Sequence, residues 1–162
     1  MTTPFWYRAE ATAIADRHQL DPDLVVTVCL VESAGKTHAY RFEPNFWLRY
    51  MAGKPQWDGA NPERVSASYG LMQVLYVVAL EQGFSRDEAP EHLFVPVVGL
   101  EYGCRKLREV LEWSGGDVPA ALAAYNGGKT ADNGPAVEEK RNQRYVDKAL
   151  AQLVRVQAGE VI

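Results

Sequence analysis

The stretch LVVTVCLVES, residues 24–33, decides the fold, because an apolar helical run ends there in a carboxylate. Asp21-Pro22, just before it, predicts a helix start, with Asp as the N-cap and Pro at the first helical position. Positions 25, 28, 29 and 32 share one face of an α-helix. Glu32 therefore follows Val25 and Cys29 toward the predicted interior. Burial penalises the charged form of a carboxyl and raises its pKa, so Glu32 is predicted to hold a proton near neutral pH.

Two later segments supply polar side chains of a different kind. The first is Gly70-Leu71-Met72-Gln73, and the second is AAYNGG at residues 123–128. Together they contribute Gln, Tyr, Asn and closely spaced Gly, residue types that are suited to lining a polar sugar groove. A protonated carboxyl beside such a groove can give its proton to a leaving glycosidic oxygen.

These segments resemble the lytic transglycosylase family of the lysozyme superfamily, the soluble type whose catalytic domain cleaves bacterial peptidoglycan. Glu32-Ser33, GLMQ and AAYNGG occur in the family's order, with a Tyr145-Val146 pair in the last predicted helix. Looser similarity runs from about Leu24 to Leu150. The resemblance implies a mostly α, lysozyme-like fold with at most a small β element, and we expect residues 1–162 to form a single domain.

The resemblance also implies a reaction. A single Glu, here Glu32, would protonate the oxygen of the β-1,4 bond between N-acetylmuramic acid and N-acetylglucosamine. The same carboxylate would then accept the proton of the muramoyl 6-hydroxyl, which attacks intramolecularly and leaves a 1,6-anhydromuramoyl end. One residue thus alternates between acid and base, so its pKa is expected near ambient pH.

Eight further residues are predicted to bind substrate or to support Glu32. Ser33 would support local hydrogen bonding, Gln73 would lie near the carboxyl, and Asn126 would contact sugar. Met72 would shape the groove floor or simply pack the core, and Tyr125 would hydrogen-bond near Glu32 or be a buried structural tyrosine. Ser66 and Ser68 are alternative matches to a family serine that contacts the acetamido group. The full set is Ser33, Ser66, Ser68, Met72, Gln73, Tyr125, Asn126 and Tyr145.

The sequence departs from the family at two places. Many members have a Glu four residues before the terminal-helix Tyr, and here that position is Arg141. The segment Val74-Leu75-Tyr76-Val77 also replaces the polar and proline residues that usually follow GLMQ. These differences indicate a divergent member.

Periodicity predicts helices over about 3–18, 22–32, 70–82, 93–113, 117–126 and 137–154. A capping box at 85–88 predicts a short helical turn. Residues 35–66 are predicted to form an irregular lobe with a short helix at 46–51. Aromatic side chains of that lobe would stack on sugar or pack its small core.

Composition and net charge limit which partners the protein can bind. The 162 residues are 47% hydrophobic and 23% charged, which is normal for a globular chain. The net charge of −4 argues against nucleic-acid binding, and it gives no long-range attraction to an anionic cell wall. The expected partner is therefore the peptidoglycan glycan strand, held by short-range contacts. No cofactor is expected, and we expect a monomer.

Cysteine, histidine and hydropathy patterns add limits. Cys29 and Cys104 are predicted to be buried free thiols, with a disulfide between them left open. The three histidines fall in no metal-ligand spacing. The N-terminus does not read as a secretory signal peptide, and no apolar run is long enough for a transmembrane helix. The expected setting is a phage lysis protein released from the host cytoplasm, a virion component, or an excised or mature domain.

Two alternatives remain open at this point. The first is a hydrolytic muramidase that adds water with a second carboxylate, Asp58 or Glu63; Glu43 is a third acid in the same lobe. The second is a non-catalytic glycan-binding or virion structural domain, since a fold alone does not establish function.

Overall fold

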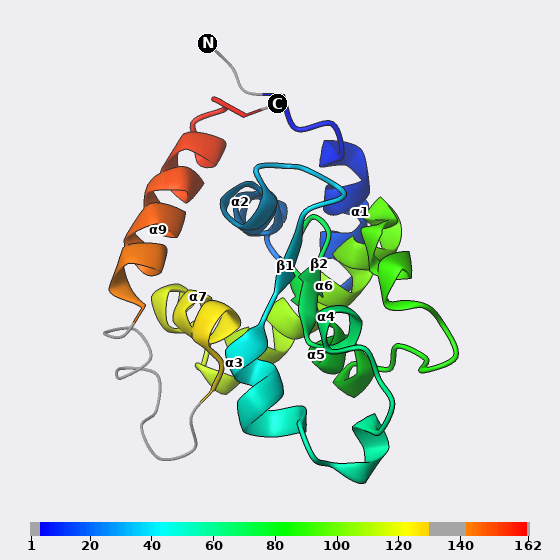
Figure 1. The fold of residues 1–162 in the computed structure, drawn as a ribbon. Coiled ribbons are helices and arrows are strands. Elements are labelled where there is room, and N and C mark those ends of the chain that lie inside the picture. Colours follow the sequence, from blue (N-terminus) through cyan, green and yellow to red (C-terminus); the bar gives the residue numbers. More distant parts are fainter. Residues whose placement is uncertain (1–3, 130–141, 162) are drawn as a thin grey trace.

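The computed structural model describes residues 4–129 and 142–161, and it consists of helices that surround a small sheet (Figure 1). The helices are α1 (Arg8–Arg17), α2 (Pro22–Ser33), α3 (Pro44–Phe46), α4 (Pro62–Val65), α5 (Tyr76–Glu81), α6 (Pro96–Trp113), α7 (Val118–Gly127) and α9 (Gln143–Gln157). Shorter turns are the π-helical η1 (Trp47–Met51) and the 3₁₀ turns η2 (Pro55–Trp57) and η3 (Pro90–Phe94). Strands β1 (Tyr40–Phe42), β2 (Ala67–Tyr69) and β3 (Val74–Leu75) pair antiparallel in that order.

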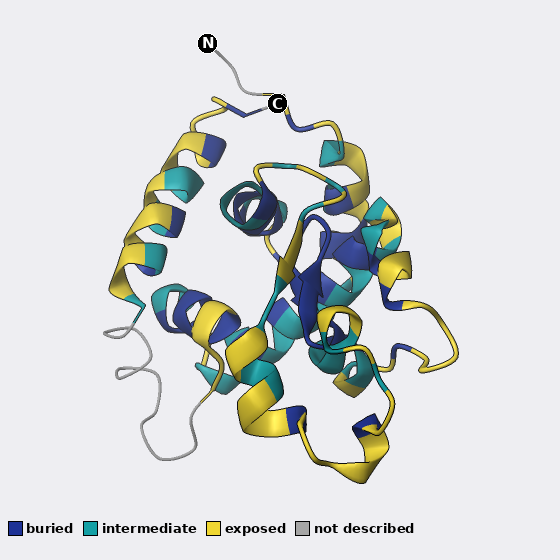
Figure 2. Ribbon diagram, viewed as in Figure 1, coloured by how far each residue is buried: buried dark blue, intermediate teal, exposed yellow. Residues whose placement is uncertain are grey.

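Helix α2 lies at the centre of the fold. It packs against α1 on one side and α9 on the other, while α6 packs against α1 and α7. Figure 2 shows α2 and β2 mostly buried, whereas α9 is largely exposed, with buried residues at intervals along its length. Buried apolar side chains of α2 and α6 form much of the core, including Val25, Val28, Leu100 and Leu107.

Two predicted helix starts are confirmed by their caps. The Asp21 side chain accepts a hydrogen bond from the Asp23 amide at 2.9 Å, and Asp117 accepts one from the Ala120 amide at 3.1 Å. These bonds satisfy amides that have no partner within the helix. Helix α2 ends at Ser33, because Ala34 adopts the left-handed conformation with φ of 52°.

The first predicted helix began too early in the chain. The structure starts α1 at Arg8, while Pro4–Trp6 is not helical and Thr3 lies outside the described residues. Phe5 is 3% exposed, and its ring lies next to Gly35 after α2. The segment before α1 thus inserts an aromatic side chain into the core, and this tertiary contact takes precedence over the local helix signal.

The predicted helix over 70–82 is wrong in its first half. GLMQ is a buried turn between β2 and β3, with left-handed φ values of 78° at Gly70 and 48° at Gln73, and α5 starts only at Tyr76. A Cβ at Gly70 would lie 2.5 Å from the Leu93 carbonyl oxygen, so the turn sits directly against η3. Leu71 points into the core from this buried turn. In the sequence, an apolar residue in a buried turn looks the same as one on the inward face of a helix.

Smaller differences follow in the next segments. Ser85 Oγ accepts a hydrogen bond from the Asp87 amide at 3.1 Å, but only a turn forms there, and η3 begins later, at Pro90. Helix α6 starts at Pro96 rather than Leu93. The short helix at 46–51 is confirmed as the end of α3 and η1. The start of the predicted terminal helix, with Val137, lies outside the described residues, and its later part is α9.

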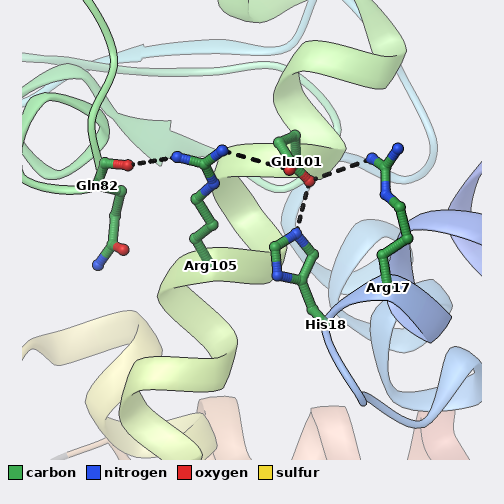
Figure 3. Close-up of polar contacts among 5 residues, drawn as sticks. All are labelled: Arg17, His18, Gln82, Glu101 and Arg105. Atoms are coloured by element: carbon green, nitrogen blue, oxygen red, sulfur yellow. Dashed lines mark hydrogen bonds and ion pairs between the residues drawn. The ribbon is translucent and has the colours of Figure 1, made fainter.

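A cluster of polar side chains fastens the end of α1 to α6 (Figure 3). The Glu101 carboxylate lies 2.6 Å from His18 Nε2 and 3.4 Å from an Arg17 nitrogen. Arg105 lies 3.4 Å from the same carboxylate and donates at 2.7 Å to the backbone oxygen of Gln82, just after α5. The cluster therefore joins three segments that are distant in sequence.

Cys29 and Cys104 are both buried and unbonded, which confirms the free thiols. Within residues 4–129 and 142–161, the helices all fall short of the length and apolar character needed to cross a lipid bilayer.

Candidate active site

Glu32 occupies the last turn of α2, where α9 packs beside it. The phenol of Tyr145 on α9 donates a hydrogen bond of 2.6 Å to its carboxylate oxygen Oε1. Burial raises the pKa of Glu32, while the Tyr145 hydrogen bond and the positive charges of Lys106 and Arg41 offset part of that rise. The carboxyl is therefore held in one orientation with a pKa above its ordinary value, as a group that first donates a proton requires.

A cavity of about 250 Å³ opens at Glu32. It is enclosed by α2, the sheet, α5, α6 and the end of α7, and one wall comes from the lobe that follows β1. Its lining combines charged, amide and apolar side chains with the backbone of two glycines. The lining residues are Glu32, Arg41, Glu43, Phe46, Ser68, Gln73, Leu75, Val78, Lys106, Tyr125, Asn126, Gly127 and Gly128.

The GLMQ turn is fixed from both sides. Its Gln73 side chain donates from Nε2 to the backbone oxygens of Ala39 at 2.9 Å and Gly70 at 3.1 Å. On the other side, Ser33 Oγ lies 2.8 Å from the carbonyl oxygens of both Cys29 and Leu71. These contacts hold the turn against the end of α2, so Gln73 lines the same cavity as Glu32.

The AAYNGG segment forms the end of α7 and closes the cavity. The Tyr125 hydroxyl donates to the backbone oxygen of Met72 at 2.7 Å, and Met72 packs against Gly103 of α6. Asn126 is exposed, lines the cavity and accepts a hydrogen bond from Asn142 at 2.9 Å. The two sequence motifs thus contact each other directly through Tyr125 and Met72.

A second and larger cavity, of about 1090 Å³, adjoins the first. The two share Phe46 and residues 126–128. The rest of its lining comes mainly from the lobe at 45–57, including Tyr50 and Trp57, and from the basic side chains Arg49 and Lys54. The lobe aromatics behave differently: Trp57 is 9% exposed and packs the core, whereas Tyr50 is 46% exposed.

The structure brings four predicted binding residues into the cavity with Glu32: Ser68, Gln73, Tyr125 and Asn126. Tyr145 contacts Glu32 itself. The other three do not line the cavity. Ser33 and Met72 are buried supports, and Ser66 is a fully buried side chain whose hydroxyl donates to the Glu43 backbone oxygen at 2.8 Å. Of the two serine alternatives, only Ser68 therefore lies at the site.

Tyr125 was predicted either to hydrogen-bond near Glu32 or to be a buried structural tyrosine. It is buried and its hydroxyl donates to the Met72 backbone oxygen, whereas the direct hydrogen bond to Glu32 comes from Tyr145. The physical reason is the tight packing of α7 on the GLMQ turn, where the Met72 carbonyl needs a donor.

Lys106 and Arg41 also line the cavity, although neither was predicted from the sequence. Arg41 donates from Nε to Glu43 at 2.6 Å, at the end of β1. A signal for Lys106 was present: it stands three residues after Gly103 and four before Val110, on a buried helix face. No comparable signal marks Arg41, because a three-residue strand has too little pattern to read.

Among the described residues there is no group of three His, Cys, Asp or Glu side chains placed to hold a metal ion.

The fold is lysozyme-like: it is similar to the structure of an inactive Glu-to-Gln mutant of lytic transglycosylase Slt from Pseudomonas aeruginosa, with a TM-score of 0.65 and 19% sequence identity. The match covers 96% of this chain and 25% of the Slt chain, so the present sequence spans about a quarter of that structure. The predicted mostly helical, lysozyme-like fold is confirmed.

The family follows from the sequence. Residues 10–148 match the model of the Transglycosylase SLT domain, and the chain belongs to this family. This confirms the family that the three motifs predicted. A search among curated proteins finds no match to the sequence.

Proposed function

We propose that this domain cleaves the glycan strand of peptidoglycan by lytic transglycosylation, with Glu32 as its single acid and base. The observation that carries the proposal is the hydrogen-bonded, largely enclosed Glu32 carboxyl at a cavity lined by amide and phenol side chains. Membership of the SLT family supports it. So does the solved Slt structure, whose Glu-to-Gln mutant is inactive.

The reaction needs two proton transfers through one carboxyl. In the first, Glu32 gives its proton to the oxygen that links muramoyl C1 to N-acetylglucosamine, and the C1–O bond breaks. In the second, the muramoyl 6-hydroxyl attacks C1 and its proton returns to Glu32. No water is consumed, and Glu32 ends in its starting state. The attack is favoured because the nucleophile belongs to the reacting ring.

The cavity side chains have matching tasks. Ser68, Gln73 and Asn126 offer hydrogen bonds to sugar amides and hydroxyls. Phe46 offers an apolar face where the two cavities meet, and the larger cavity with Tyr50 provides room for further sugar units of the strand. Tyr145 orients the Glu32 carboxyl through its hydrogen bond.

A hydrolytic reaction is the second candidate, and one observation favours it. Glu43 lines the same cavity as Glu32, whereas the lining includes neither Asp58 nor Glu63. Glu43 would act as the base that activates a water molecule. Against this role, the Glu43 carboxylate is already paired with Arg41 at 2.6 Å, and this ion pair makes it a weaker base toward water.

Mass spectrometry of digested peptidoglycan tests the proposal. Lytic cleavage gives muramoyl ends lighter by one water than the reducing ends left by hydrolysis. We expect anhydro ends from the wild type, and a loss of about 100-fold or more in rate for Glu32→Gln, as for removal of a general acid.

The matched control is Glu43→Gln, which removes the other cavity carboxyl and should leave anhydro products. Reducing ends that disappear in Glu43→Gln would establish the hydrolytic reaction instead. A wild type that binds glycan and releases no product of either mass would identify a binding domain.

A further inference from the structure

Lys106 is a charged side chain on the buried face of α6. It shares that face with Gly103 and Val110, both buried, and it lines the cavity that holds Glu32. Lysines are seldom enclosed in this way unless an oppositely charged side chain is paired with them.

The ammonium group of Lys106 is held by α7. It donates at 2.7 Å to the backbone oxygen of Tyr125, and it lies 4.2 Å from the centre of the Tyr125 ring. The backbone oxygen belongs to the last turn of α7, which lacks helical donors and carries the negative end of the helix dipole. Both contacts are uncharged, and within the described part of the chain no carboxylate lies within 4.0 Å of the ammonium to form an ion pair.

The fixed ammonium acts on Glu32 through space. Its charge lowers the pKa of Glu32, second only to the Tyr145 hydrogen bond among the effects that oppose burial. Burial lowers the pKa of Lys106 itself to about 8, so the group carries its charge at neutral pH. Other charged or titratable groups around the pair are Cys29, Arg41, Glu43, Glu81, Glu109, Tyr125, Tyr145 and Lys148.

We propose that Lys106 is a positioning residue of the reaction, whose ammonium stabilises the carboxylate that Glu32 becomes after it has protonated the glycosidic oxygen. This inference rests on the proposed function, because it needs Glu32 as the acid and base. Lys106 keeps its own proton throughout, so the proton balance of the two steps is unchanged. The α7 contacts aim the charge, and the enclosed cavity strengthens its effect on Glu32.

The test is the pH dependence of kcat and kcat/KM for glycan cleavage. Lys106→Gln keeps a donor for the Tyr125 oxygen and removes the charge, whereas Lys106→Arg keeps the charge. Activity falls as pH rises through the pKa of Glu32, since the first step needs its proton. In Lys106→Gln this alkaline midpoint should move to higher pH, and kcat should fall on the order of tenfold because the carboxylate is less stabilised. Lys106→Arg should keep the wild-type midpoint.

A merely structural role would give a different result. If Lys106 only caps α7, Lys106→Gln should lower the melting temperature or kcat without moving the midpoint, and this outcome would overturn the proposal. Lys36→Met is the matched control: it removes an exposed positive charge close to Glu32 in sequence but outside the cavity, and should change neither quantity.

A readout without turnover separates this inference from the proposed function. The carboxyl ¹³C signal of Glu32, assigned by its absence in Glu32→Gln, reports the titration directly. An upward shift of that titration in Lys106→Gln supports the inference even if cleavage proves to be hydrolytic. An unshifted titration overturns it even if anhydro products are found.

Discussion

Glu32 works against the stability of the fold that holds it. Burial raises its pKa in the folded protein, and the Tyr145 hydrogen bond and the Lys106 charge recover only part of that effect. In the unfolded chain the carboxyl ionises at the ordinary Glu value of about 4.3. Between these two pKa values the folded protein binds more protons than the unfolded chain, so stability falls as pH rises through this window.

Glu32→Gln should therefore be more stable than the wild type at neutral pH, because the wild-type carboxyl ionises more readily in the unfolded chain than inside the folded protein, and this favours unfolding. The gain should vanish below about pH 4, where Glu32 is protonated in both states. Urea denaturation across this range measures the difference. Glu10→Gln, which changes an exposed carboxyl of α1, is the control and should show no such gain. An equal free energy of unfolding for Glu32→Gln and wild type at neutral pH would contradict the argument.

The burial of Glu32 could be predicted because one helix carries that signal, whereas its role as the acid was implied by the family resemblance. Periodicity alone places it on the face of Val25 and Cys29. The same reasoning could not assign its partner, since Tyr145 is 113 residues away and reaches Glu32 only through the packing of α9 on α2. Tyr145 was predicted as a site residue from a resemblance, and its contact with the carboxyl needed coordinates.

At the scale of elements, the GLMQ turn is set by how closely α6 approaches it. Gly103 makes this approach possible, because a Cβ at that position would lie 2.4 Å from Met72 Sδ. Met72 is fully buried, and its backbone oxygen accepts the Tyr125 hydrogen bond. The contact with α6 thus fixes Met72, which precedes Gln73 in the chain and bonds to Tyr125 near the end of α7.

Gly103→Ala should destabilise the fold by about 1–3 kcal/mol, as for added volume in a packed core. Helix propensity alone predicts that the variant is more stable, since Ala is favoured over Gly inside a helix by about 0.5–1 kcal/mol. The sign of the change in the free energy of unfolding therefore shows which of the two effects is larger. Equilibrium unfolding of Gly103→Ala, Met72→Ala and the double variant measures it. The double variant should lose less than the sum of the single variants, because the smaller side chain makes room; additive losses would mean that the two residues do not compete for space.

Elements with local signals were predictable, and those that depend on distant contacts were not. The caps of α2 and α7 are formed by residues two or three positions away, so Asp21 and Asp117 marked them correctly. The GLMQ turn was read as helix because a buried turn and a helix face are both apolar. What distinguishes them is the approach of Gly70 to Leu93, and this contact crosses 23 residues of sequence (93 − 70).

At the scale of the molecule, the Glu101 cluster joins α1, α6 and the segment just after α5 (Figure 3). Burial raises the pKa of Glu101, but the His18 hydrogen bond and the charges of His18, Arg105 and Arg17 outweigh it, so the pKa lies below its ordinary value. The sign is opposite to that of Glu32. Here the carboxylate stabilises the folded protein above the ordinary Glu pKa, and this stabilisation is lost as pH falls through the lowered value.

Glu101→Gln should lose about 1.5–3 kcal/mol at neutral pH, the range for hydrogen bonds to a charged group. The loss should shrink toward zero as the pH falls through the lowered pKa of Glu101, because the wild-type carboxyl is then protonated as well. Glu112→Gln breaks the more exposed pair with Arg108 and should change stability by at most about 1 kcal/mol. Urea denaturation of both variants and of Glu32→Gln over one pH series compares the two carboxyls directly. We expect Glu101→Gln to lower stability and Glu32→Gln to raise it at neutral pH. If both variants change stability in the same direction, the proposal that the Glu101 carboxylate stabilises the fold while the Glu32 carboxyl destabilises it is wrong.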